Sequence, residues 1–182
     1  MQVVSESRIR YLAPLKKWRL MDLDSLRIEA NYPGSLAGFR KHILNLEKKG
    51  LVKKFRDNHS LKNFVCLTRD GEGLFGLSEN SASISDETFD HDSRLSVLGR
   101  NFLEFDSIKS IVLEHELRLG NQFAKNKVHI PDGILYGNKG KAKFKMALEL
   151  ELTRKTRSRY LSKVEDYLKS TVYDYVLYFF HT

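Results

Sequence analysis

PDGILYGNKGKAKFKMALELEL, residues 131–152, is the stretch that decides the fold of the C-terminal half. Asp132 lies at the start of one expected strand, and Glu149 and Glu151 alternate with leucines on the next. Because side chains on a strand alternate between faces, the two glutamates point to the same side. Three carboxylates that meet at the ends of neighbouring strands can bind a hard cation such as Mg²⁺. The stretch therefore predicts a metal site.

Basic residues follow the acidic pair directly, in an expected helix over residues 157–170. Carboxylate-bound metal beside positive charge is the chemistry that phosphodiester cleavage requires. Lys155, Arg157, Arg159 and Lys163 would follow such a site and could contact backbone phosphate. A plainer interpretation stays open: Pro-Asp-Gly is also a turn signal, and the glutamates and the helix charges could form solvated faces.

The elements around this stretch follow from its apolar periodicity. From residue 93 we expect the order helix, strand, strand, strand, helix, strand. The last strand is almost wholly apolar, which favours a central position covered on both faces. The expected ranges are 93–105, 107–119, 128–136, 144–152, 157–170 and 172–180.

The N-terminal segment, residues 1–77, reads as three helices and a basic hairpin. A first helix over 5–18 is kinked or broken at Pro14. Asp22 is a candidate N-cap for the second helix, 23–30. Ser35 caps the third, whose buried face carries Leu36, Phe39, Ile43 and Leu46. A strand begins at residues 51–52, a second covers 64–67, and the basic tip between them includes Lys53, Lys54 and Arg56.

Composition and charge set the class of protein. The chain has 182 residues, of which 41% are hydrophobic and 30% charged, as in soluble globular proteins. The net charge of +8 is unevenly distributed, because residues 78–105 carry 2 Lys+Arg against 6 Asp+Glu and basic segments flank them. We expect an acidic linker at 78–92 and a polyanionic partner, nucleic acid first. The sequence has no membrane-spanning run or signal peptide, and its single cysteine fits the cytoplasm.

The segments LNLEKKGLVKKF (44–55) and VCLTRDGEGL (65–74) resemble those of winged helix-turn-helix domains, over about residues 5–77. The resemblance implies that the third helix enters a major groove and that the hairpin lies over phosphates or enters the minor groove. A contact with protein instead of DNA stays open. The DNA-binding residues that it implies are Ser35, Arg40 and Lys41 on the helix and Lys53, Lys54 and Arg56 on the wing.

The C-terminal order, with PDG and ELE on successive strands, resembles the PD-(D/E)XK nuclease superfamily over about residues 91–182. The resemblance implies an α+β protein whose C-terminal domain, 93–182, has αβββαβ topology. It also implies that Asp132 and Glu149 bind Mg²⁺ or Mn²⁺. The superfamily's usual lysine two residues later is Glu151 here. In one interpretation Glu151 is a third active-site group, as in Glu-x-Glu enzymes, and Lys155 or a helix arginine supplies positive charge that stabilises developing charge. In the other, the site is degenerate and the domain only binds DNA.

The combination of HDSRL (91–95), PDGIL and ALELELTRKTRSRYLSKVEDY (147–167) resembles replication-relaxation and mobilisation proteins of plasmids and conjugative elements. Two functional hypotheses follow. The first is a Mg²⁺-dependent endonuclease that its winged helix targets to DNA. The second is a non-catalytic transcriptional regulator or origin-binding protein, in which the nuclease-like half contacts DNA or forms a homodimer.

Overall fold

The computed structural model describes residues 9–57, 60–76, 84–119, 129–153 and 155–180. The chain forms two compact units, Met1–Ser96 and Val97–Thr182. Each unit combines helices with its own β-sheet, so the predicted α+β class is confirmed. No helix in the described part of the chain is long and apolar enough to cross a membrane.

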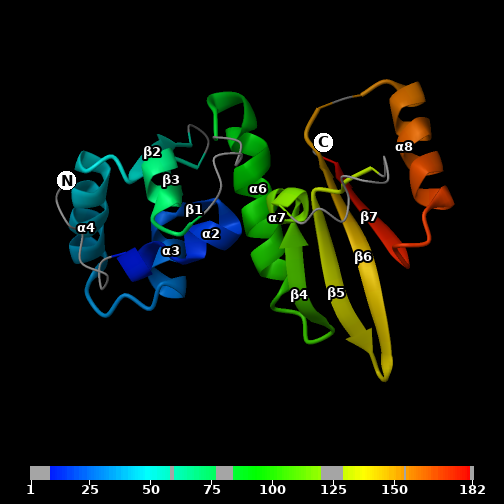
Figure 1. Ribbon diagram of the computed structural model, residues 1–182, viewed down its shortest axis with the longest axis horizontal. Coiled ribbons are helices and arrows are strands. Elements are labelled where there is room, and N and C mark those ends of the chain that lie inside the picture. The colour runs from blue at the N-terminus through cyan, green and yellow to red at the C-terminus, as the bar shows by residue number, and fades with distance from the viewer. Residues whose placement is uncertain (1–8, 58–59, 77–83, 120–128, 154, 181–182) are drawn as a thin grey trace. The chain divides into compact units, whose positions relative to one another are not determined.

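The N-terminal unit has the element order of a winged helix-turn-helix (Figure 1). Its three-stranded sheet has the order β1-β3-β2, with antiparallel pairing throughout. The predicted winged helix-turn-helix is therefore confirmed at the level of element order. The elements are η1 (Arg10–Leu12), α2 (Pro14–Trp18), β1 (Leu20–Asp22), α3 (Leu23–Glu29), α4 (Leu36–Lys48), β2 (Val52–Arg56), β3 (Asn63–Leu67) and α5 (Arg69–Gly73).

Local chemistry places these helices as expected. Pro14 is the first residue of α2, where its missing N–H costs nothing. The Asp22 carboxylate accepts a hydrogen bond from the Ser25 N–H at 3.0 Å and caps α3. The Ser35 hydroxyl accepts one from the Gly38 N–H at 3.2 Å and caps α4. The sequence analysis misses β1, because three buried residues between two helices give no strand periodicity.

The expected linker contains the start of a long helix. α6 (Asp86–Phe102) begins seven residues before the predicted helix, so the segment from Asp86 is helical rather than a linker. Phe89 is the reason: its ring packs against Phe55 and Phe64 at centroid distances of 5.5 and 5.4 Å. These rings form one buried cluster with Leu20 and Cys66. The first half of α6 therefore covers a face of the N-terminal sheet.

The C-terminal unit contains a four-stranded sheet in the order β4-β5-β6-β7 (Figure 1). β4, β5 and β6 are antiparallel neighbours, and β7 pairs with β6 in parallel after the helical crossover through α8. This is the expected strand, strand, strand, helix, strand order, with one short helix added after the first strand. The elements are β4 (Ile108–Leu113), α7 (Glu114–Leu119), β5 (Gly133–Lys139), β6 (Ala142–Glu151), α8 (Arg157–Lys169) and β7 (Tyr175–Phe180).

Helices lie on both faces of this sheet. Tyr160 of α8 contacts Phe180, whereas Phe102, at the end of α6, contacts Phe179 on the opposite side of the strand. Glu149 and Tyr178 are cross-strand partners, so both lie on the α8 face. This face of the sheet carries the candidate carboxylates.

Two predictions about this unit are wrong. The segment after Leu113 is the helix α7, not the end of a strand; the Leu113 N–H donates to the Glu116 carboxylate at 2.8 Å and stabilises its first turn. β7 is the edge strand of the described sheet and is half-exposed, not central. An apolar sequence alone does not distinguish an edge strand from a central one. Three apolar side chains of α8 are exposed: Leu161, Val164 and Leu168.

Candidate functional site

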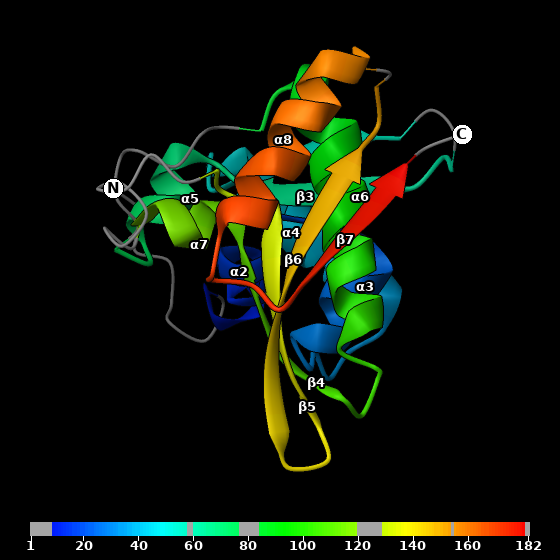
Figure 2. The same cartoon turned by 90° about the vertical axis from the view of Figure 1, so that its right-hand side faces the viewer.

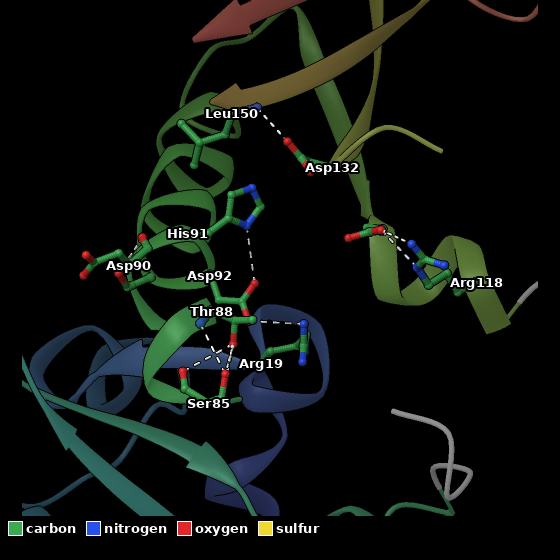
Figure 3. A network of polar contacts seen from close by, with 11 residues as sticks. Arg19, Ser85, Thr88, Asp90, His91, Asp92, Arg118, Asp132 and Leu150 are labelled. Atoms are coloured by element: carbon green, nitrogen blue, oxygen red, sulfur yellow. Dashed lines mark hydrogen bonds and ion pairs between the residues drawn. The ribbon is translucent and has the colours of Figure 1, made fainter. Parts of the chain in front are cut away.

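The backbone fixes Asp132 at the point where β5 begins. Its carboxylate accepts a hydrogen bond from the Leu150 N–H of β6 at 2.6 Å, as Figure 3 shows. Its backbone carbonyl accepts one from the Glu114 N–H, at the start of α7, at 2.9 Å. Asp132 therefore links the start of β5 to β6 and to the first residue of α7. As placed, the Asp132 side chain has a structural role at the strand end.

Glu149 lies near the end of β6, beneath α8, and is 1% exposed. Three side chains surround its carboxylate. The Lys163 Nζ lies 2.5 Å from one oxygen, the His129 Nε2 lies 2.7 Å from the other, and the Tyr167 hydroxyl donates to the same oxygen as His129. A buried carboxylate needs such partners, because desolvation of an unpaired charge is costly.

Glu151 lies two residues farther along the same face and is 6% exposed. Its carboxylate forms an ion pair with the Lys155 ammonium and accepts a hydrogen bond from the Thr153 hydroxyl at 3.3 Å. Lys155 was predicted to serve an active site. The structure brings it to Glu151, where its charge is neutralised by the carboxylate beside it.

Three tyrosines line the cluster and are held in the neutral form. Burial and the Glu149 carboxylate raise the pKa of Tyr167 well above its ordinary value. Burial, with Tyr136 and then Glu149 as lesser causes, raises the pKa of Tyr173 to about 12. Burial and then Glu149 raise that of Tyr178 to about 12. These phenols therefore stay protonated at neutral pH, which disfavours any of them as a nucleophile.

The carboxylates as placed do not fit a divalent metal. Among the described residues there is no group of three or more His, Cys, Asp or Glu side chains able to hold one. Lys163 supplies the positive charge at Glu149, and Lys155 supplies it at Glu151. The assignment of Asp132, Glu149 and Glu151 as Mg²⁺ or Mn²⁺ ligands stays a prediction.

The winged helix presents a second candidate surface. Arg40 and Lys41 are exposed on the N-terminal half of α4, and Lys53 and Arg56 are exposed on β2. Among the other predicted DNA contacts, Ser35 uses its hydroxyl to cap α4, and Arg157 and Arg159 are exposed in the first turn of α8. The Lys54 ammonium is paired with the Glu47 carboxylate of α4 at 2.7 Å, so its charge is partly neutralised.

The partners of Glu149 are what sequence reasoning missed. Tyr167 reads as a core residue from helical spacing, and His129 has no motif. A signal does exist for two of them, because Lys163 and Tyr167 are four residues apart and so share one helix face. That face points at the carboxylates, as the contacts above show. His129 precedes Asp132 by three residues, and nothing in the local pattern marks it.

His91 and Asp92 fall in the expected linker but lie inside α6. The Asp92 carboxylate lies 3.3 Å from the Arg19 guanidinium and 3.6 Å from the His91 ring (Figure 3). All three residues belong to the N-terminal unit. The contact fastens α6 to the C-cap of α2 and forms a structural ion pair.

No protein-family model matches the chain, and no curated protein matches it. A similar solved structure is the crystal structure of a transcriptional regulator of the MarR family from Silicibacter pomeroyi. It is 20% identical, and the match covers 69% of this chain and 75% of that chain with a TM-score of 0.35. A similarity at this level carries no argument about function.

Proposed function

We propose that the protein binds duplex DNA through α4 and the β2–β3 hairpin, as a regulator or origin-binding protein. The observation that supports the proposal is the helix–strand–helix–helix–hairpin order with exposed basic residues on the helix and on the hairpin. In such domains the second helix of the helix-turn-helix enters the major groove and its N-terminal residues reach base edges. Arg40 and Lys41 lie in that half of α4.

The basic residues of α4 and of β2 would contact different parts of the DNA. Arg40 can form bidentate hydrogen bonds to guanine or contact a phosphate, and Lys41 neutralises a phosphate. Lys53 and Arg56 lie along β2 and would contact the backbone beside the groove. Because Lys54 is paired with Glu47, we expect it to contribute less than its two neighbours.

The experiment compares two double variants of α4 that lose the same charge. Arg40→Ala with Lys41→Ala should weaken duplex binding at least tenfold. It should lower the slope of log K against log salt by about 1 if Arg40 contacts a base and by about 2 if it contacts a phosphate, because each lost phosphate contact removes about 0.9. Lys48→Ala with Lys49→Ala, at the C-terminal end of the same helix, should stay within threefold of wild type. Equal losses in both variants would contradict the proposal.

A second candidate function is DNA cleavage by the C-terminal unit. The observation that favours it is the order helix, strand, short helix, strand, strand, helix, strand, with Asp132, Glu149 and Glu151 at one end of β5 and β6. That order supports a PD-(D/E)XK-like domain, in which the three carboxylates would be the candidate ligands and Lys155 the candidate charge donor. The ion pairs at Glu149 and Glu151 count against it.

Cleavage is tested with supercoiled plasmid and either Mg²⁺ or Mn²⁺. If the protein is a nuclease, the wild type should nick the plasmid and the Asp132→Ala variant should not. Direct titration of the protein with Mn²⁺ gives an independent readout of the metal site. If wild type neither cuts nor binds Mn²⁺, the regulator proposal stands and the C-terminal fold serves binding alone.

A further inference from the structure

The β5–β6 hairpin projects from the sheet of the C-terminal unit. β5 and β6 pair from Gly133↔Leu148 to Lys139↔Ala142, so only Gly140 and Lys141 form the turn. Gly140 has a φ of +61°, the left-handed conformation that two-residue hairpin turns require. A tight turn of this kind fixes the side chains near the tip in a defined arrangement.

The tip extends past both neighbouring strands. β4 pairs with β5 only as far as Ile108↔Gly137, followed by one hydrogen bond from the Asn138 N–H to the Ser107 carbonyl. β7 begins to pair with β6 at Met146. Residues 138–145 therefore form a two-stranded ribbon that is hydrogen-bonded to neighbouring segments at Asn138 and Lys145, at its base, and that Figures 1 and 2 show as the projecting end of the sheet.

This ribbon is strongly basic. Lys139, Lys141, Lys143 and Lys145 are all exposed, and residues 133–148 contain no aspartate or glutamate. No described carboxylate forms an ion pair with the first three of these lysines. Asp174 lies at the base of the ribbon, where its carboxylate accepts a hydrogen bond from the Lys145 N–H at 2.7 Å.

Two of the lysines share one face of β6, and a third lies in the turn before them. Lys143 and Lys145 point to the same side of β6, because side chains alternate along a strand, and are about 6.8 Å apart along it. Lys141 lies in the turn, two residues before Lys143. The Lys145 ammonium lies 6.0 Å from the centroid of the Tyr136 ring, its cross-strand partner, which orients that side chain. Each lysine can thus reach a different anionic group of a long polymer.

We infer that the ribbon of residues 138–145 is a second DNA-contacting element, which neutralises backbone phosphates of a duplex. A two-stranded β-ribbon is narrow enough for a major groove about 12 Å wide. The repeated positive charge suits a polyanion whose phosphates repeat at short intervals. Its tip consists of Gly140, Lys141 and Ala142 and has no large apolar side chain to insert into a lipid surface. The contact is additional to the winged helix and belongs to the other unit of the chain.

The experiment measures binding of the full chain to a fluorescent 30-base-pair duplex of random sequence over a series of NaCl concentrations. Lys141→Gln with Lys143→Gln should weaken binding about five- to tenfold at low salt. It should also lower the salt slope by about 2, or about 0.9 for each phosphate released. The control, Lys109→Gln with Lys169→Gln, removes the same charge from exposed positions of the same unit. We expect a change of less than twofold there.

The double variant Lys141→Arg, Lys143→Arg keeps the positive charge and changes the side-chain shape. If charge determines the contact, this variant should bind DNA with wild-type affinity. The inference would be overturned if the Lys141→Gln, Lys143→Gln variant lost no more DNA affinity than the Lys109→Gln, Lys169→Gln control. Unchanged DNA binding combined with lost binding to phosphatidylserine vesicles would also overturn it, because the ribbon would then serve a membrane. The Arg40 and Lys41 variants are scored separately, so failure of the ribbon leaves the winged-helix proposal untouched.

Discussion

Glu149 is the residue whose surroundings explain most of the C-terminal unit. Its carboxylate is nearly inaccessible and is held by side chains from α8 and from the segment before β5. Removing one partner of a buried ion pair leaves the other charge without compensation, and this costs more than the pair itself contributes. The ion pair therefore attaches α8 to the sheet whether or not the unit has any catalytic role.

The first prediction concerns Lys163→Met, which retains the aliphatic stem and removes the charge. We expect the free energy of unfolding to fall by about 3 kcal/mol, measured by urea denaturation. Lys169→Met is the matched control on the same helix, because its contact with Glu165 is 4.0 Å long and highly exposed. The control should change stability by less than about 0.5 kcal/mol. Equal effects in the two variants would mean that the Glu149 pair is not structural.

The second prediction concerns Cys66, the single thiol of the chain. Burial raises the pKa of Cys66 from 9.0 to about 11. The folded state therefore retains the proton above pH 9, and the free energy of unfolding falls as the pH rises from about 9 to about 11. Two pKa units correspond to about 2.7 kcal/mol, so we expect an alkaline loss of about 2 kcal/mol.

This loss is measured as the difference in urea stability between pH 8 and pH 10.5. Cys66→Ala should lose less over the same interval, because it has no thiol to titrate. Reaction of the native wild type with a thiol reagent at pH 8 should be slow and should accelerate on unfolding. Rapid modification of the native protein would contradict the buried position of the thiol.

At the scale of single residues, the sequence predicts the helix N-caps but not the side chains that contact Glu149. Asp22 and Ser35 are recognisable because an N-cap acts on residues two or three positions away. The contacts of Glu149 with Lys163 and His129 join residues 14 and 20 positions apart. No local pattern encodes such pairs, since they depend on how α8 lies across the sheet. The sequence shows the acidic pair Glu149 and Glu151, but it does not show that Lys163 and Lys155 neutralise the two carboxylates.

At the scale of single elements, the short helix α5 shows how one glycine can be indispensable and its neighbour not. A Cβ on Gly71 would lie 2.0 Å from the Leu51 carbonyl oxygen, whereas a Cβ on Gly73 would meet no atom within 4 Å. Both residues belong to the same five-residue helix. Gly71 therefore allows α5 to pack closely against the start of the wing.

The third prediction follows from this difference. Gly71→Ala should lower the free energy of unfolding by about 1–3 kcal/mol, because the backbone must shift to relieve the clash. Gly73→Ala should leave stability unchanged or raise it by up to about 1 kcal/mol, since alanine favours helix. Thermal denaturation of the two variants beside wild type decides the point, and a destabilised Gly73→Ala would show that the clash is not the cause.

Element types were more predictable than element positions. The helix α8 and the strands β5 and β6 have clear periodicity, so their existence follows from sequence, with boundaries displaced by a few residues. The segment 114–119 was expected in a strand because its apolar and polar residues alternate. Two local hydrogen bonds favour a helical turn there: the Glu116 carboxylate accepts one from the Leu113 N–H, and the Arg118 guanidinium donates one to the Glu114 carboxylate.

At the scale of the whole molecule, α6 belongs to both units. The chain divides between residues 96 and 97, inside this helix. Phe89 completes the core of the N-terminal unit, and Phe102 contacts Phe179 in the C-terminal unit. The acidic composition of residues 78–92 predicts a linker. A single aromatic residue, Phe89, among so many polar ones gives no periodic signal, although its side chain anchors the segment to the core.

The fourth prediction tests this division. A fragment of residues 1–96 should unfold cooperatively, whereas a fragment of residues 1–77 should be destabilised because it lacks Phe89. Phe89→Ala in the full chain isolates the effect and should cost about 3–4 kcal/mol. Urea denaturation followed by the single tryptophan, Trp18 of the N-terminal unit, reports on the unit concerned. Equal stability of the two fragments would place residues 84–96 outside the N-terminal core.

The position of β7 has a consequence for handling the protein. Residues 175–180, YVLYFF, form the outer strand of the described sheet and contain no charge, proline or glycine. Proteins usually protect such an edge with lysine, proline or a bulge, because its free N–H and C=O groups can pair with another chain. A short uncharged segment of high β-propensity is also the composition that nucleates amyloid-like stacking. Self-association should therefore begin at this edge as the concentration rises.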